Sequence, residues 1–166
     1  MCGIVGAIAA RPVSEILLEG LRRLEYRGYD SAGMTVWDGN QINRLRRAGK
    51  VQALGDALAE TPLEGQLGIA HTRWATHGKP SEQNAHPHMS GERLAVVHNG
   101  IIENFRALRT ELAAAGIAHE TETDTETVAL LTHYHMTRGM GPVEAAQATI
   151  PPLDGAYALC FLFVGR

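Results

Sequence analysis

The order of strand-like and helix-like segments constrains the fold of this chain most. Apolar runs typical of buried strands occur at the start, middle and end of the sequence, with helix-like segments in pairs between them. The expected strands are 2–9, 33–37, 41–48, 67–74, 93–98 and 156–164, with a short one closing near 121; the expected helices are one from 14 to about 27, and 51–60, 105–115, 126–138 and 143–150. No glycine-rich phosphate-binding pattern follows the first strand, so a layered sandwich of helices and sheets is favoured over nucleotide-binding folds.

Polar residues at the starts of the expected helices predict how those helices are capped. Ser14 and Asn104 are suitable N-cap residues, and Thr123 with Glu126 has the spacing of a capping box. Gly28 is a suitable stop for the first helix. The same local rules interpret Asn99-Gly100, after the strand 93–98, as a turn.

Composition excludes several classes of protein. The chain has 166 residues and a net charge of −3, which suits one globular domain and gives no electrostatic reason to bind nucleic acid or a membrane surface. No apolar run is long enough to cross a membrane, and no signal peptide is evident, so a cytoplasmic protein is expected. The two cysteines do not form a disulfide framework, and Cys160 lies in an apolar run typical of a buried strand.

Cys2 is the candidate nucleophile. A small residue at position 2 favours removal of Met1, which would leave Cys2 with both a thiol and a free α-amine. An α-amino group titrates at about 7.7–8.0, so a useful fraction is neutral near pH 7 and can accept the proton of the thiol. Because the thiolate is the reactive form, such a terminus needs no separate histidine as base.

Two further segments carry candidate chemistry, each with an alternative interpretation. Residues 75–88 form a long loop rich in hydrogen-bonding side chains, whose Gly78 and Pro80 suit a lid over a substrate. The Asn99-Gly100 pair is either a turn or an oxyanion hole built from an amide and a backbone N–H. Asp124 is either a helix cap or a partner for the ammonium group of a ligand.

Six motifs, in this order, resemble those of a known family. They lie at residues 2–6, 24–33, 71–78, 84–88, 98–104 and 123–126. Together they closely resemble the glutaminase domain of class II glutamine amidotransferases of the glucosamine-6-phosphate synthase kind, and the resemblance covers essentially the whole chain. It implies an α+β fold, the four-layer αββα sandwich of the N-terminal nucleophile hydrolases.

The resemblance also implies roles for individual residues. Cys2 would be the nucleophile with its own α-amine as base, and Asn99 and Gly100 would form the oxyanion hole. Arg73 would bind the α-carboxylate of L-glutamine and Asp124 its α-ammonium group, which agrees with the geometry of an arginine fork and the charge of an aspartate. The remaining implied residues are Trp74, Thr76 and His77 in the loop over bound glutamine, and Arg27 and His86 in supporting positions. Neither a metal nor another cofactor is implied.

The implied reaction is hydrolysis of glutamine to glutamate and ammonia through a γ-glutamyl thioester. In the synthases, further strands and a sugar-phosphate isomerase half follow, and ammonia is used with fructose 6-phosphate to make glucosamine 6-phosphate. We therefore expect residues 1–166 to be an incomplete glutaminase domain, truncated at the C-terminus with an unpaired sheet edge. Expected partners are L-glutamine and the isomerase half, while a homodimer formed through missing regions stays open.

Three other functions compete with this one. The first is the glutaminase half of another class II amidotransferase, such as amidophosphoribosyltransferase, although residues 73–78 and 25–30 favour the synthases. The second is a metal hydrolase, since the chain has 8 histidines, but His133 and His135 cannot share a helix face and no HExxH motif is present. The third is a module that binds glutamine without turnover.

Overall fold

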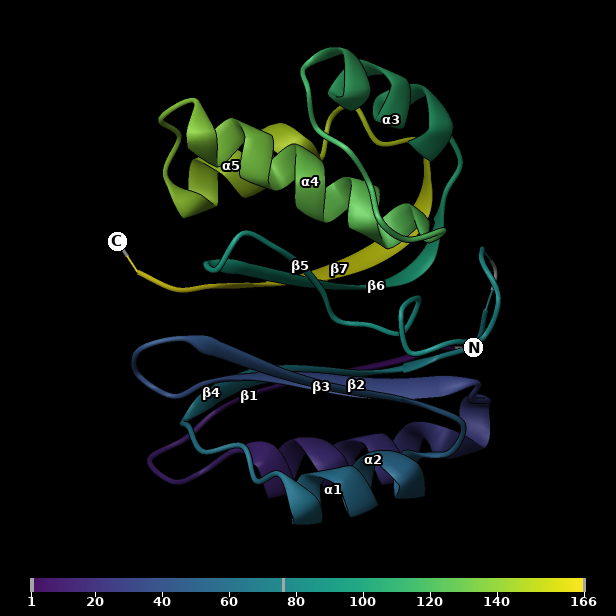
Figure 1. Cartoon of the computed structure of the whole chain (residues 1–166), viewed down its shortest axis with the longest axis vertical. Helices are drawn as coiled ribbons and strands as arrows, with labels where there is room; N and C mark the ends of the chain where they lie inside the picture. Colours follow the sequence, from purple (N-terminus) through teal and green to yellow (C-terminus); the bar gives the residue numbers. More distant parts are fainter. Residues whose placement is uncertain (1, 76, 166) are drawn as a thin grey trace.

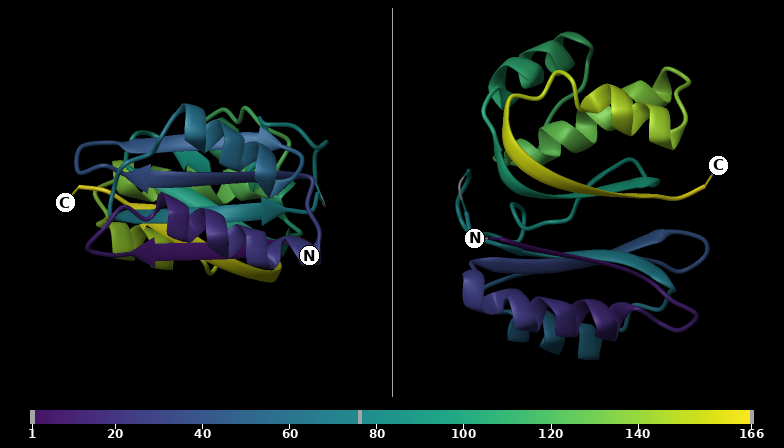
Figure 2. Two further views of the ribbon diagram at one scale, coloured as in Figure 1. Left: turned by 90° about the horizontal axis from the view of Figure 1, so that it is seen from below. Right: turned by 180° about the vertical axis from the view of Figure 1, so that it is seen from behind.

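Two antiparallel sheets form the middle of the molecule, and helices cover the outer face of each (Figure 1). The computed structural model describes residues 2–75 and 77–165. The first sheet has the order β1-β4-β2-β3, with β1 (Gly3–Ile8), β4 (Leu67–Arg73), β2 (Ser31–Trp37) and β3 (Ile42–Ala48). The second has the order β5-β6-β7, with β5 (His88–Ser90), β6 (Leu94–Ile102) and β7 (Gly155–Phe163). The expected four-layer αββα sandwich is confirmed, and Figure 2 shows its layers from two further sides.

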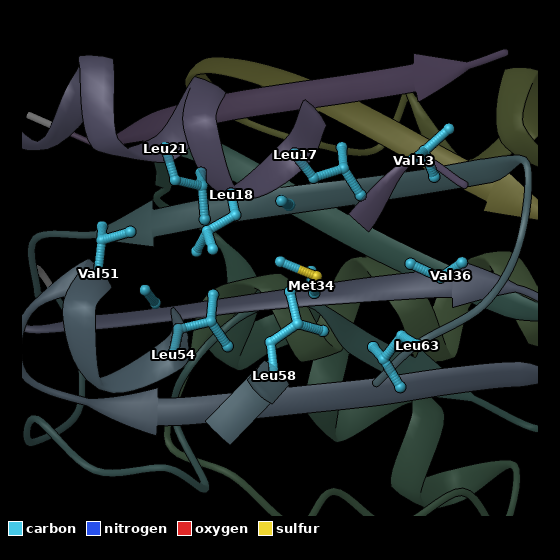
Figure 3. Packing of buried hydrophobic residues seen from close by; sticks show 12 residues of the cluster. Val13, Leu17, Leu18, Leu21, Met34, Val36, Val51, Leu54, Leu58 and Leu63 are labelled. Carbon is cyan, nitrogen blue, oxygen red and sulfur yellow. The ribbon is translucent and has the colours of Figure 1, made fainter. Parts of the chain in front are cut away.

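The helices of each outer layer bury an apolar stripe against the adjacent sheet. Helices α1 (Ser14–Leu24) and α2 (Val51–Glu60) cover the first sheet, where their leucines contact Met34 and Val36 of β2 (Figure 3). The second sheet is covered by α3 (Phe105–Ala114), α4 (Asp124–Thr137) and α5 (Pro142–Thr149). Among the described residues, no helix combines the length and the hydropathy that a membrane span requires.

The layer between the two sheets has an apolar and a polar part. Alternate residues of a strand face opposite sides, so Ala95 and Val97 of β6 point toward the first sheet. They pack in a cluster with Ile69 of β4 and with Ile42 and Leu162. Other buried residues nearby are polar, among them His71 of β4, His98 of β6 and Thr125 of α4. The candidate site lies at this polar part.

Several expected local features are wrong in detail. The chain runs extended through Asn99 and Gly100, which pair with Ala158 and Tyr157 of β7, so Asn99-Gly100 is not a turn. No strand forms near residue 121, and the short strand β5 was not expected. These differences arise because pairing with a distant strand decides where a strand ends, and local turn preferences do not.

Two of the expected helix caps use their side chains elsewhere. Ser14 is the first helical residue of α1 and its hydroxyl donates to the carbonyl of Leu63. The Asn104 side chain donates to the Pro152 carbonyl at 2.7 Å and accepts from the Asp154 N–H at 3.0 Å. By contrast, the Thr123 hydroxyl accepts from the Glu126 N–H, as half of a capping box would.

Leu17 provides a measure of how strongly the first outer layer is packed. Its side chain is fully buried between α1 and the first sheet (Figure 3). We expect Leu17→Ala to lower the free energy of unfolding by about 2–5 kcal/mol through lost burial and a new cavity. Urea unfolding measures this, with Val143→Ala as control because Val143 is 68% exposed. An effect of Leu17→Ala no larger than that of the control would contradict the packing described here.

Candidate active site

The site lies where β1 begins and β4 ends. Cys2 directly precedes β1, and Arg73 is the last residue of β4. The two strands pair antiparallel, with Gly3 opposite Thr72, so Cys2 and Arg73 lie next to each other at the same end of the sheet. A β-carbon at Gly3 would lie 2.9 Å from the Thr72 hydroxyl oxygen, so only glycine allows this close approach.

Cys2 contacts both the loop after β4 and the second sheet. Its Sγ accepts a hydrogen bond from the Trp74 N–H at 3.2 Å. Its carbonyl oxygen lies 3.3 Å from Asn99 Nδ2, which donates to it. The loop after β4 and strand β6 of the second sheet therefore both contact Cys2.

Gly100 follows Asn99 in β6 and has a conformation that other residues rarely adopt. Its φ is +118°, in the left-handed region, where side chains are strained. A β-carbon at this position would lie 2.1 Å from the carbonyl oxygen of Ala156 in β7. Backbone conformation and close packing therefore both require glycine at position 100.

Asp124 is held at the N-terminus of α4. It is only 4% exposed, and its Oδ2 accepts from the Ile102 N–H at 2.9 Å. A carboxylate is favourable at this position because the N-terminus of a helix carries a partial positive charge. The nearest basic groups are the Nδ1 atoms of His77 and His98, each 3.8 Å from a carboxylate oxygen.

Arg73 is bound to the loop that follows it. Its side chain is 3% exposed, and the guanidinium donates to the carbonyl oxygens of His77, of Gly78 at 3.2 Å and of Lys79 at 3.3 Å. The Asp30 Oδ1 atom lies 3.7 Å from Nη1 of Arg73, and the Asp30 carboxylate also accepts a hydrogen bond from the Ala75 N–H. Arg73 and Asp30 together hold the start of the loop against the sheets.

Of the other residues expected at the site, Trp74 and His77 line the same pocket as Cys2. Trp74 is 54% exposed and its ring covers Gly28, where a β-carbon would lie 2.6 Å from the indole. His77 packs edge-on against Phe105, with 5.0 Å between ring centroids. Thr76 lies outside the described residues. Arg27, half-buried at the end of the short helix η1 (Glu25–Arg27), is not among the described residues that line the pocket.

These side chains surround one small pocket. The described residues lining it are Cys2, Arg73, Trp74, His77, His86, His98, Gly100, Thr123, Asp124 and Thr125. A thiol, a buried cation and a buried anion thus face a single space. Such a site can recognise the carboxylate and ammonium groups of an amino acid while presenting its side chain to a nucleophile.

Four buried histidines, His71, His86, His88 and His98, lie in or next to this site, and sequence reasoning gave a role only to His86. The rings of His71 and His86 lie 4.2 Å apart, and those of His86 and His88 4.8 Å apart. Both His86 Nε2 and His98 Nδ1 lie within hydrogen-bond distance of the Thr125 hydroxyl, at 2.6 and 3.0 Å. Burial lowers the pKa of His71 to about 3 and brings the pKa values of His86 and His88 well below the usual value. These histidines are therefore neutral near pH 7.

The histidines are not arranged as a metal site. Among residues 2–75 and 77–165, no cluster of three or more His, Cys, Asp or Glu side chains has a metal-binding arrangement. His88 Nε2 instead lies 2.9 Å from the Thr123 hydroxyl, and His133 Nδ1 lies 3.1 Å from the Ser90 carbonyl oxygen. A sequence signal for the cluster existed, since His71 and His98 fall on strands that are otherwise apolar.

An αββα sandwich with a cysteine directly before its first strand has the fold of the N-terminal nucleophile class of enzymes. Residues 71–164 match the family model described as a glutamine amidotransferase domain. The chain belongs to this glutamine amidotransferase family.

Known proteins resemble the chain along nearly its whole length. Glutamine–fructose-6-phosphate aminotransferase [isomerizing] of Escherichia coli K12 is 62% identical over 158 residues, and that of Shewanella oneidensis 58% over 157. Each alignment covers 95% of this chain but only 26% of the relative. The solved structure of glutamine phosphoribosylpyrophosphate amidotransferase from B. subtilis matches with a TM-score of 0.85 at 24% identity, covering 98% of this chain and 35% of that one. At this identity the match concerns the fold alone.

Proposed function

We propose that the chain is the glutaminase part of a glucosamine-6-phosphate synthase and that it hydrolyses L-glutamine to glutamate and ammonia. The observation that carries the proposal is the convergence of Cys2, Arg73 and Asp124 on one pocket. The 62% identity to the Escherichia coli aminotransferase favours this kind of synthase over amidophosphoribosyltransferases, for which the likeness is one of fold.

Glutamine recognition is assigned to two buried charges. Arg73 would bind the α-carboxylate through its planar fork, and Asp124 the α-ammonium group. In the structure, the Arg73 guanidinium donates to the carbonyl oxygens of residues 77–79. A carboxylate bound to Arg73 would replace some of these hydrogen bonds. We therefore expect the loop around Trp74, Thr76 and His77 to rearrange when glutamine enters.

Bond cleavage is assigned to Cys2 once Met1 is removed. The α-amine of Cys2 takes the proton of the thiol, and the thiolate attacks the side-chain carbonyl carbon of glutamine. The negative charge that develops on the carbonyl oxygen is stabilised by the Asn99 side-chain amide and the Gly100 N–H. The amide nitrogen takes a proton from the α-ammonium group of Cys2 and leaves as ammonia. Water then hydrolyses the γ-glutamyl thioester.

The use of the ammonia is assigned to residues outside this chain. The chain spans 26% of the length of the aminotransferases it matches, and the name of these enzymes includes both an amino transfer and an isomerisation. We propose that an isomerase half, acting on fructose 6-phosphate, is the partner that consumes the ammonia.

Two further residues have proposed supporting roles. Arg27 would support the nucleophile, and His86 would support the pocket from its wall.

A covalent label tests the assignment of the nucleophile. The glutamine analogue 6-diazo-5-oxonorleucine carries an electrophilic carbon in place of the amide, and we expect it to add one equivalent to the thiol of Cys2. Intact mass and peptide mapping measure this, with Cys2→Ala as control. Cys160 provides an internal comparison because burial raises the pKa of its thiol. Adducts on both cysteines, or none on demethionylated chain, would overturn the proposal.

A substitution at Asp124 tests the assignment of the ammonium partner. Asp124→Asn keeps an oxygen that can accept from the Ile102 N–H but removes the negative charge. We expect KM for glutamine to rise about 10- to 100-fold, since a hydrogen bond to a charged group contributes about 1.5–3 kcal/mol. Steady-state ammonia release measures KM, and Glu15→Gln on the exposed start of α1 is the matched control. An unchanged KM would assign the ammonium group to another residue.

A further inference from the structure

His71 makes a hydrogen bond that joins the two sheets at the candidate active site. It lies in β4 of the first sheet and is 1% exposed. Its Nε2 lies 2.9 Å from the Asn99 side-chain oxygen Oδ1 and 2.9 Å from the His98 carbonyl oxygen. Asn99 and His98 both belong to β6, so this one nitrogen contacts the second sheet twice.

These contacts determine the protonation of the ring. The His98 carbonyl oxygen can only accept a hydrogen bond, so Nε2 must carry the hydrogen. His71 Nδ1 is buried and has no partner among the described residues, which suits the unprotonated nitrogen of a neutral ring. Burial also lowers the pKa of His71 to about 3, so the ring stays neutral at physiological pH.

The same contacts determine how the Asn99 amide is turned. An asparagine amide has an oxygen on one side and an NH₂ group on the other, and the two can be exchanged by rotating the amide. The His71 N–H requires the oxygen on its side. The Cys2 carbonyl, 3.3 Å from Nδ2, requires the NH₂ group on the other. Both neighbours therefore select the orientation in which the NH₂ group faces the nucleophile.

We infer that His71 is a positioning residue for the oxyanion hole, holding the Asn99 NH₂ group toward the reacting carbonyl. This inference rests on the proposed glutaminase function. His71 is not among the described residues lining the pocket, so it acts through Asn99 and not on the substrate. Without its N–H, the amide can turn and direct an oxygen at the developing negative charge.

Two amide substitutions separate this role from a general effect on packing. His71→Gln carries an NH₂ group near the position of Nε2, whereas His71→Asn is too short to reach Asn99. We expect His71→Asn to lower kcat for glutamine hydrolysis about 10- to 100-fold with KM within about twofold, and His71→Gln to restore most of the loss. His133→Asn is the matched control, since His133 also bonds a carbonyl oxygen, that of Ser90, but is not among the described residues lining the pocket. Equal losses in all three variants would overturn the inference.

A double substitution tests whether His71 acts through Asn99. If it does, His71→Asn in an Asn99→Ala background should lower kcat no further, within about twofold. Losses that multiply would mean an independent effect and would overturn the inference.

A measurement that needs no turnover separates this inference from the proposed function. In ¹H–¹⁵N spectra, the Asn99 side-chain NH₂ signals are assigned by their loss in Asn99→Ala. We expect His71→Asn to shift them and His71→Gln to return them toward their original positions. Unchanged signals in His71→Asn would overturn the positioning role. A chain that shows the expected shifts but releases no ammonia would instead overturn the glutaminase proposal.

Discussion

Asn99→Ala is expected to lower kcat for glutamine hydrolysis about 10²- to 10³-fold while leaving KM nearly unchanged. Loss of one oxyanion-hole donor costs about that much in enzymes that stabilise a tetrahedral intermediate. The Asn99 amide contacts the Cys2 carbonyl and the His71 ring, so its removal leaves Arg73 and Asp124 in place. Ammonia release under steady-state conditions separates the two kinetic constants.

Asn104→Ala is the matched control for this prediction. Its side chain also makes two hydrogen bonds, but to Pro152 and Asp154, away from the pocket. We expect it to lower stability and to leave kcat within about twofold of the original value. If Asn99→Ala raises KM with kcat unchanged, the amide binds the ground state of the substrate and is not an oxyanion donor.

Acid is expected to destabilise the protein already between pH 6.5 and pH 5, where most carboxylates are still ionised. His71, His86 and His88 are buried, and their pKa values in the folded state are lowered from the ordinary value of about 6.5. The unfolded chain therefore binds more protons below pH 6.5, and stability falls as the pH falls from there toward the folded pKa values. At pH 5 His71 alone removes about 2 kcal/mol of a typical total of about 5–15, and His86 and His88 act in the same direction.

Urea unfolding at a series of pH values measures this effect. Between pH 6 and 5 we expect the free energy of unfolding to fall by about 1.2 kcal/mol because of His71, and further because of His86 and His88. Carboxylates contribute mainly below that window. His88→Asn should make the fall in stability with pH less steep, whereas His119→Gln, at an exposed position, should leave it unchanged. Stability that stays constant from pH 7 to pH 5 would contradict the burial of neutral imidazoles.

Elements with a strong periodic pattern could be predicted from the sequence. Helix α2 spans Val51–Glu60, as expected, because Val51, Leu54 and Leu58 recur at helical spacing and are all buried. The αββα architecture came from the resemblance of six motifs, since spacing alone predicted only a layered sandwich. The ends of β6 could not be predicted, because Asn-Gly favours turns locally while pairing with β7 keeps the chain extended through Ile102.

The same limit applies to side chains whose partners are far away in the sequence. Ser14 and Asn104 satisfy local capping rules, but they bond Leu63 and Pro152, 49 and 48 positions away. For the candidate site, the sequence predicted the individual residues, and the fold brings Cys2, Arg73 and Asp124 to one pocket. The orientation of Asn99 by His71 could not be predicted, because no sequence pattern indicates which two strands face each other across the sandwich.

The pairing of β1 with β4 has a consequence for how this protein should be produced. The ladder begins at Gly3 opposite Thr72, so every paired residue of β1 lies after Cys2. Folding and chemical maturation are therefore separable steps. Under the proposed mechanism, an affinity tag fused before Cys2 would leave the sandwich intact and give an inactive precursor, which cleavage of the single peptide bond before Cys2 would activate.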